Sequence, residues 1–363
     1  MNNLKKLFAL ILCLAVMVTC FTGCHKKGEI SVKIGDIEFT SGYYACALVF
    51  ADTEARATVE TDLSEKGDLP DKINYWDYKV EDTDYVEWVE TAALNNLKDL
   101  AALMTLCAEA GVELDAETKS LALSNADYLW DTYGYSALME ANGVSKETFR
   151  QYMQDGYLAD AYFEHLYAKG GEKEIAADKI SEQLVNNYVL VNQIVVSFEG
   201  MSDEKKESSK NQLATYEASL KEGKASFEDV YLSYNNLSAE DHKHEEAKEG
   251  EVLPQDQHAT ILGNEDTGYA SDYFTAAKAL AVGEVKVITL EENAGLVLLV
   301  RKDISADPYY LSELDLTLRR DIVGDGYTDE VSKYGSELSC EVITSSTKQF
   351  KVKKLVYPES LYY

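Results

Sequence analysis

The sequence predicts an α+β fold, in which a mainly helical body accompanies a smaller domain that contains a sheet. Apolar residues recur at helical spacing along most of 41–170, and this period is typical of amphipathic helices. Strand-like apolar segments follow at 188–196 and between 285 and 300. A chain of 363 residues is long enough for two domains, each with its own hydrophobic core.

The first 23 residues predict a signal peptide. Lys5 and Lys6 precede an apolar run at 7–18, which is too short to span a bilayer comfortably. The letters FTGC at 21–24 are similar to a bacterial lipobox. We therefore expect cleavage before Cys24, lipid on its sulfur, and a chain that is lipid-anchored at the extracytoplasmic face of the cell membrane. An uncleaved membrane anchor is the alternative.

The charge of the chain excludes some partners. With 34 basic and 64 acidic residues the net charge is −30, and loss of Lys5 and Lys6 with the acid-free leader takes it to −32. Such a chain is repelled by nucleic acid and by anionic lipid. The three remaining cysteines, Cys46, Cys107 and Cys340, form no disulfide framework, and we expect them to be buried as small hydrophobes.

The helical body is predicted element by element. Residues 30–39 alternate as strands around a Gly-Asp turn, and a helix starts at Thr40 or Ser41. Residues 55–83 are polar and acidic, which predicts a long loop whose aromatic residues pack back. A strong helix follows from 84 to 111.

The caps of the next helices are also predicted. Asp84 and Glu87 have the spacing of a capping box, and Gly111 ends that helix. Further helices begin at Asp115 and Ser145. Short loops between these helices predict antiparallel packing in one helical domain.

The second half of the chain has shorter elements. Helices are expected over 202–220 and 227–234, and a helix over 271–281 has Ala277 and Leu280 on one face. After residue 304 we expect a helix from about 312 to 334. A β pair formed by 340–343 and 350–356 is predicted to follow it.

Residues 188–304 resemble a parvulin-type (PpiC-like) peptidyl-prolyl isomerase domain. The letters AAKAL at 276–280, GEV at 283–285, GLVLL at 295–299 and SFED at 226–229 occupy the places of family motifs in the family order. The resemblance implies a four-stranded antiparallel sheet that is flanked by helices.

The segment at 30–39 is similar to the start of SurA/PrsA-type chaperones. In PrsA-type foldases the segment after the isomerase domain returns to complete the helical domain. By this resemblance 1–23 is the lipoprotein signal peptide and 24–187 the helical chaperone-like domain. The parvulin-like insertion is then 188–304, and 305–363 completes the helical domain.

The residues at the family's catalytic positions differ from the family pattern. Parvulins place two histidines and an acid or thiol around the proline. Here these positions hold Gln193, Val297 and Leu237, while Tyr269 and Tyr273 occupy the place of the aromatic residue that binds substrate. The resemblance therefore implies a foldase for secreted polypeptides whose isomerase domain has low or no catalytic activity. An active isomerase and a two-lobed ligand-binding lipoprotein are the alternatives.

Histidines and tyrosines supply the remaining candidates. His242 and His244 precede two glutamates, which suits either a flexible metal site or a solvated loop. We expect the loop, no metal and no cofactor, with His165 and His258 isolated. Six tyrosines could line a surface that holds unfolded chains or could be half-buried core residues: Tyr43, Tyr44, Tyr75, Tyr78, Tyr128 and Tyr133.

Overall fold

The computed structural model describes residues 28–70, 72–240, 242–248, 252–264, 269–290 and 294–358, except the side chains of 269–272. The predicted signal peptide and the lipidation predicted at Cys24 therefore lie outside the described residues. In the part of the chain that is described, no helix has both the length and the apolar character needed to cross a membrane. The chain divides into two compact units, unit 1 (Met1–Lys173 and Asp325–Tyr363) and unit 2 (Glu174–Gly324).

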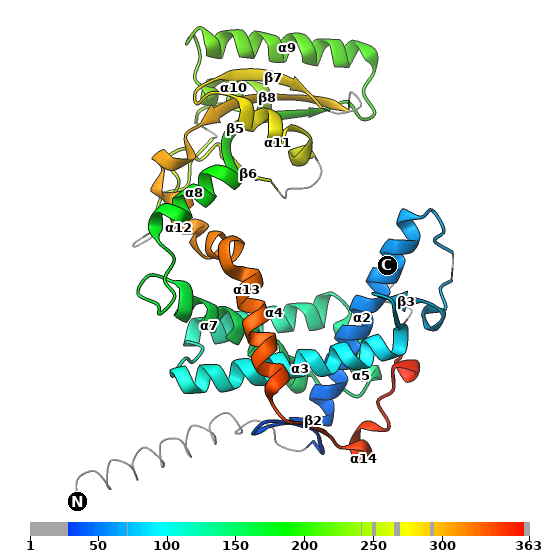
Figure 1. Ribbon diagram of the computed structural model, residues 1–363. Coiled ribbons are helices and arrows are strands. Elements are labelled where there is room, and N and C mark those ends of the chain that lie inside the picture. Colours follow the sequence, from blue (N-terminus) through cyan, green and yellow to red (C-terminus); the bar gives the residue numbers. More distant parts are fainter. Residues whose placement is uncertain are drawn as a thin grey trace, which may run out of the picture. The chain divides into compact units, whose positions relative to one another are not determined.

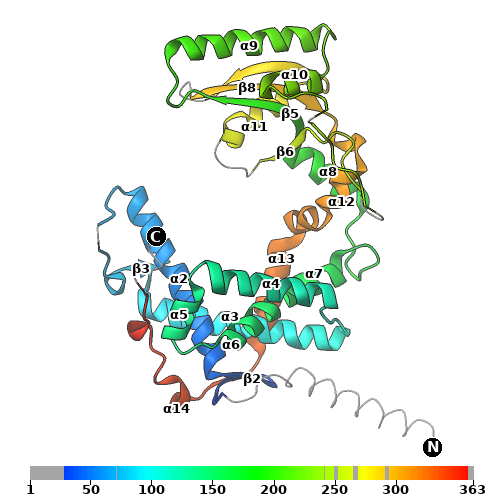
Figure 2. The same cartoon turned by 180° about the vertical axis from the view of Figure 1, so that it is seen from behind.

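Unit 1 is mainly helical and carries two small antiparallel sheets (Figure 1, Figure 2). Its helices are α2 (Ser41–Glu65), α3 (Tyr85–Ala110), α4 (Ala116–Thr132), α5 (Tyr135–Ala141), α6 (Lys146–Gly156), α7 (Leu158–Tyr167), the second half of α13 (Asp315–Glu337) and α14 (Thr344–Thr347). Its strands are β1 (Ile30–Ile34), β2 (Ile37–Thr40), β3 (Lys79–Val80), β4 (Thr83–Asp84) and β9 (Cys340–Val342). The larger sheet has the order β2-β1-β9, and β3 pairs with β4.

The long loop predicted for 55–83 is wrong in its first part, because α2 continues to Glu65. Ala55, Val59 and Leu63 are buried and lie four residues apart. They therefore continue the buried side of the helix. The acidic residues between them face solvent, and their number obscured the helical period in the sequence.

The predicted ends of α3 are only partly confirmed. Gly111 closes the helix with a φ of +69°, a left-handed conformation that glycine adopts without steric cost. At the N-terminus of α3, the Asp84 side chain accepts no hydrogen bond from the first turn among the described residues. The capping box predicted there is therefore wrong. Tyr85 instead packs against Tyr75 and Trp76, with ring centroids 6.0 and 5.4 Å away.

The β pair predicted at the C-terminus is also wrong. Strand β9 pairs with β1, so that Val342 lies opposite Val32. The segment 350–356 instead contains a 3-10 helix, η4 (Val352–Lys354). The Asn142 side chain clamps the end of this segment, since its Nδ2 donates to the Val356 carbonyl at 2.8 Å and its Oδ1 accepts from the Val356 amide at 2.9 Å. A side chain thus satisfies backbone groups that the prediction assigned to a partner strand.

The second half of α13 packs closely within unit 1. A Cβ atom added at Gly335 would lie 2.7 Å from the Lys98 carbonyl oxygen of α3, so only glycine permits this approach. The Tyr327 hydroxyl donates to the Ala159 carbonyl of α7 at 2.7 Å. The chain after residue 324 therefore contributes core contacts to the helical unit.

Unit 2 is built on a four-stranded antiparallel sheet of order β6-β5-β8-β7. The strands are β5 (Tyr188–Ser197), β6 (Ala259–Gly263), β7 (Val285–Thr289) and β8 (Gly295–Lys302). The helices are α8 (Ala177–Asn187), α9 (Asp203–Lys221), α10 (Phe227–Asn235), α11 (Tyr269–Ala279), the 3-10 helix η3 (Ile304–Ala306), α12 (Pro308–Glu313) and the first half of α13. The α+β fold class and the antiparallel sheet that the resemblance implied are confirmed.

Each face of this sheet has its own buried cluster. Val189 and Val191 of β5 pack with α11 residues on one face. Ile194 and Val196 pack on the other face with residues of α9 and α10 (Figure 1). The sheet is therefore covered on both sides, as the mixed apolar pattern of β5 requires.

The cysteine expectation holds at two positions out of three. Cys46 and Cys107 are buried, and burial raises the pKa of both thiols, that of Cys107 to about 12. Cys340 is exposed on β9, so the prediction that it is buried is wrong. Since β9 lies at the edge of its sheet, its side chains have little to pack against.

Candidate functional site

Gln193 and Val297 lie on the same face of neighbouring strands. In the β5–β8 ladder, Gln193 is opposite Leu299 and Val195 is opposite Val297. Side chains alternate along a strand, so all four point to the same side of the sheet. The two positions where the family resemblance places histidines are therefore adjacent in this sheet.

Tyr273 brings α11 onto this face. Its hydroxyl donates a hydrogen bond to Oε1 of Gln193 at 2.6 Å. Tyr273 is only 2 % exposed, and Val297 is fully buried in the same cluster. The tyrosine side chain thus lies beside Gln193 and belongs to the same buried cluster as Val297.

This arrangement lacks the groups needed to share a proton near neutral pH. The glutamine amide is a fixed donor and acceptor, and the valine side chain has no polar atom. Val297 and Tyr273 are both shielded from solvent. These side chains are part of the packed core of unit 2.

Of the other predicted site residues, the structure places one away from this face and does not describe the side chains of two. Leu237 follows the end of α10, is 42 % exposed, and α10 packs on the opposite face of the sheet through Phe227 and Val230. Tyr269 is the first residue of α11, and its side chain lies outside the described part of the structure. Cys24 also lies outside it.

The expectation that His258 is isolated is wrong. Its ring centroid lies 5.0 Å from that of His242 and 4.9 Å from that of His244. His258 is separated from the other two by more than a dozen residues, and neither spacing nor periodicity relates them in the sequence. Only the return of the chain at β6 brings them together. His165, in contrast, lies in unit 1 on α7.

Two of the six tyrosines are core residues and do not line a binding surface. Tyr43 is 1 % and Tyr44 is 6 % exposed. The Tyr43 hydroxyl donates to the Asp155 carboxylate of α6, and Gln151 donates to the same carboxylate at 2.7 Å. Burial raises the pKa of Asp155 to about 6 despite these bonds.

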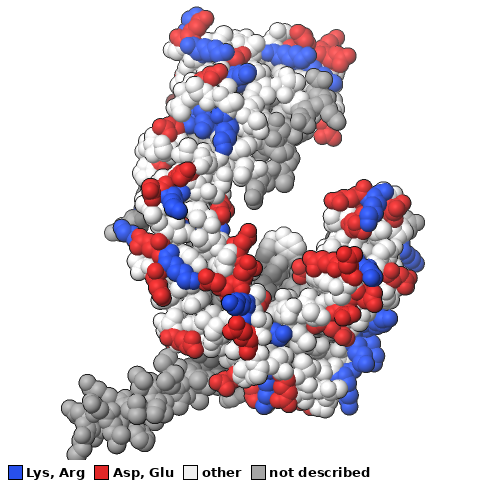
Figure 3. All heavy atoms as spheres, viewed as in Figure 1, with Lys and Arg blue, Asp and Glu red and all other residues white. Residues whose placement is uncertain are grey.

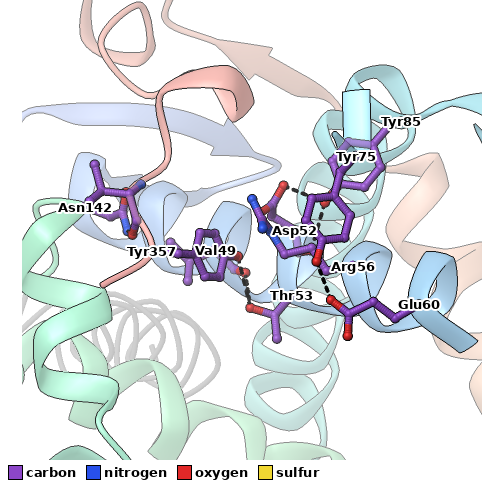
Figure 4. Close-up of polar contacts among 10 residues, drawn as sticks. Val49, Asp52, Thr53, Arg56, Glu60, Tyr75, Tyr85, Asn142 and Tyr357 are labelled. Atoms are coloured by element: carbon purple, nitrogen blue, oxygen red, sulfur yellow. Dashed lines mark hydrogen bonds and ion pairs between the residues drawn. The ribbon is translucent and has the colours of Figure 1, made fainter. Parts of the chain in front are cut away.

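Tyr75 and Tyr78 are half-buried. Tyr75 donates to the Glu60 carboxylate, and the guanidinium of Arg56 lies 4.2 Å from its ring centroid (Figure 4). These contacts give Tyr75 a structural role in unit 1.

Among the residues of unit 1 that the structure describes, the exposed aromatic side chains lie on and beside α4. Tyr128 is 56 % and Tyr133 57 % exposed, and their rings pack edge to face at 5.4 Å. Leu121 is 54 % exposed and lies two turns before Tyr128. Leu121, Asn125 and Tyr128 follow helical spacing, so they share one side of α4. We call this side, together with Tyr133, the α4 surface.

A cavity of about 800 Å³ continues the α4 surface. Thr118 lines the cavity one turn before Leu121, and so does Tyr157, whose hydroxyl accepts a hydrogen bond from Asn125 at 2.7 Å. Five acidic residues line it against a single lysine: Glu113, Asp115, Asp160, Glu164 and Glu172. In the view of Figure 3, acidic side chains also spread over the rest of unit 1 with basic ones among them. The cavity therefore favours cationic groups.

Comparisons with known proteins find similarity at the level of structure. No protein-family model matches the chain, and no curated protein matches it. Solved structures that it resembles include foldase proteins named PrsA. That of Streptococcus pneumoniae has a TM-score of 0.41 and 13% sequence identity, and the match covers 79% of this chain and 100% of the other.

Two further PrsA structures are similar. That of Lactococcus lactis has a TM-score of 0.38 and 16% identity, with 71% of this chain and 89% of the other covered. That of Bacillus subtilis has a TM-score of 0.30 and 14% identity, with 76% and 90% covered.

Proposed function

We propose that this chain is an extracytoplasmic chaperone that holds unfolded segments of secreted polypeptides and assists their folding. The observation that carries this proposal is the α4 surface, where exposed tyrosine and leucine side chains adjoin an acidic cavity. Tyrosine suits such binding because it offers a large apolar face, a polar tip and few rotamers. The helical body, 24–187 with 305–363, would supply this function.

The charge of the chain supports weak and reversible binding. Exposed apolar side chains attract apolar segments of an unfolded client, and the acidic cavity attracts the lysines and arginines near them. The net charge of −30 keeps chaperone molecules apart from one another. Three apolar side chains offer too little area for tight binding, so a client is released as it folds.

Residues 188–304 would be a parvulin-like module with low or no catalytic activity. The hydrogen bond between Tyr273 and Gln193 and the buried Val297 support this, because the positions of the imidazoles are filled by an amide and an apolar core side chain. By the resemblance, Tyr269 and Tyr273 would be the substrate-binding residues of this module, and Tyr273 would have to leave its buried position to contact a client. The alternative of an active isomerase is decided by a kinetic assay.

Holding at the α4 surface has a direct test. Replacing both Leu121 and Tyr128 by serine is expected to abolish most suppression of aggregation of a reduced, unfolded client, measured by light scattering. Both side chains are more than half exposed, so the fold is retained. Val185→Ser is the matched control, because Val185 is 46 % exposed on α8 of unit 2. Equal loss in both variants, or no loss in either, contradicts the proposal.

Attachment to the membrane through lipid at Cys24 is part of the proposal. The lipobox-like letters before Cys24 support it. The full chain is expected in the membrane fraction of cells, and Cys24→Ala is expected to leave an uncleaved leader without lipid. Metabolic labelling with a fatty acid measures the difference. Equal label in the Cys24→Ala chain would exclude this lipidation site.

A further inference from the structure

Three histidines of unit 2 form a compact cluster. His242 and His244 lie in the loop after α10, and His258 immediately precedes β6. The ring centroids of the three are 4.9–5.0 Å apart, and one side-chain nitrogen from each lies within 4.8 Å of the others. Imidazole nitrogens at this separation are close to the geometry of a shared ligand set.

Two imidazole nitrogens of the cluster are buried and lack a partner. Among the described residues, Nε2 of His242 and Nε2 of His258 have no hydrogen-bond partner. Burial of a polar atom is unfavourable when nothing satisfies it, and such atoms are uncommon in folded proteins.

The surroundings hold the cluster in place. The Tyr231 ring lies 4.5 Å from that of His258 and 5.4 Å from that of His242. Asp256 accepts a hydrogen bond from the His258 amide at 3.0 Å and forms an ion pair with Lys302 of β8 at 2.7 Å. His258 is therefore fixed to the sheet.

Glu228 gives His244 an outer partner. Its Oε1 lies 3.5 Å from Nε2 of His244. A carboxylate in this position orients the ring and raises the basicity of the other nitrogen, which is the usual arrangement behind a metal-bound histidine. The cluster thus consists of three imidazoles, and the Glu228 carboxylate lies behind the imidazole of His244.

We propose that His242, His244 and His258 form a binding site for a first-row transition-metal dication such as Zn²⁺. A tetrahedral ion with Zn–N bonds of about 2.0–2.1 Å requires its nitrogens to be about 3.3 Å apart. His242 and His244 lie in a loop and would have to approach His258, which its backbone bond to Asp256 holds in place. Imidazole ligands favour Zn²⁺, Cu²⁺ and Ni²⁺ over Mg²⁺ and Ca²⁺. A cavity of about 360 Å³ beside the rings leaves room for a further ligand.

The test is calorimetric titration of the chelator-treated full chain with Zn²⁺ in excess Mg²⁺. The magnesium occupies surface carboxylates, which prefer hard cations. One equivalent is expected to bind to the wild-type chain. His258→Asn and His244→Asn are each expected to weaken binding more than about 100-fold, since loss even of an outer-shell partner costs 10–100-fold. The matched control is His165→Asn, because His165 is exposed in unit 1.

A second measurement keeps the test decisive. Co²⁺ in place of Zn²⁺ is expected to give the visible absorption of a nitrogen-ligated tetrahedral ion in the wild-type and His165→Asn chains only. His244 is 39 % exposed at its side chain, so its variant is expected to fold. Binding that excess Mg²⁺ removes, or that is equal in the His244→Asn and wild-type chains, overturns the proposal.

Discussion

Replacing Asp52 by alanine is expected to lower the free energy of unfolding of unit 1 by about 3–5 kcal/mol, the range for breaking a buried charge pair from one side. The Asp52 side chain is fully buried in α2. Its Oδ2 accepts from Nε of Arg56 at 2.8 Å, and its Oδ1 accepts from the Tyr85 hydroxyl at 2.9 Å (Figure 4). Alanine leaves the Arg56 guanidinium without its carboxylate, while the Tyr85 hydroxyl keeps only the Asp52 backbone carbonyl at 3.2 Å.

Most of the lost stability is expected to come from the Arg56 guanidinium, which stays buried without its carboxylate partner. The Arg56 guanidinium lies between two rings, 4.2 Å from the centroid of Tyr75 and 3.8 Å from that of Tyr357. Its side chain is only 15 % exposed, so water replaces the lost carboxylate poorly. Because Tyr357 belongs to the C-terminal segment, the loss also loosens the contact of this segment with α2.

The chain offers a control on the same helix. Asp62 pairs with Lys66 at 2.5 Å with the same spacing of four residues, but both side chains are more than half exposed. Asp62→Ala is expected to change stability by no more than about 0.5 kcal/mol, as for other exposed pairs. Urea unfolding followed by tryptophan fluorescence separates the two variants, since Trp76, Trp88 and Trp130 all lie in unit 1. Equal effects would show that the burial of Asp52 is unimportant.

The elements that could be predicted are those whose pattern is local. The β1–β2 hairpin, α3 up to Gly111 and the sheet strands follow from alternation, helical period and turn residues. The pattern does not predict the end of α2, because its three buried residues, Ala55, Val59 and Leu63, are surrounded by acidic residues. The pairing of β9 with β1 is not predicted, because pairing between strands more than 300 residues apart leaves no local signal in the sequence.

The candidate sites also divide into features with a local sequence pattern and features that depend on contacts between distant residues. Motif order placed Gln193 and Val297 on neighbouring strands, and the β5–β8 register agrees. The role of Tyr43 was not predictable, because its burial depends on Asp155, 112 residues away. The meeting of His242 with His258 depends on where a polar loop returns to the sheet. Composition alone gives no such information.

The second large effect is expected in unit 2. Val297→His is expected to destabilise this unit by about 2–5 kcal/mol, through overpacking and an unpaired buried imidazole. Val297 has no exposed surface and packs with Tyr273 and Leu299. Hydrogen exchange of the β5 and β8 amides measures the loss, because the tryptophans report on unit 1 only.

Gln193→His is the matched substitution, because Gln193 is only half-buried. Histidine can accept the hydrogen bond from the Tyr273 hydroxyl that the glutamine accepts at 2.6 Å. The expected loss is therefore no more than about 1.5 kcal/mol, the net value of one hydrogen bond. A loss equal to that of Val297→His would show that the two positions are buried alike.

Neither substitution is expected to create isomerase activity. In a protease-coupled assay on a proline peptide, the wild-type chain and both variants are expected to leave the barrier of about 18–20 kcal/mol unchanged. The reason is burial: Tyr273 and Val297 pack in one cluster shielded from solvent, and a restored imidazole does not open that cluster to a peptide. Faster isomerisation by the wild-type chain would mean that Tyr273 swings out to open the pocket. In that case the hydrogen bond to Gln193 would hold Tyr273 in its buried position, and Tyr273→Phe should raise the rate of isomerisation further.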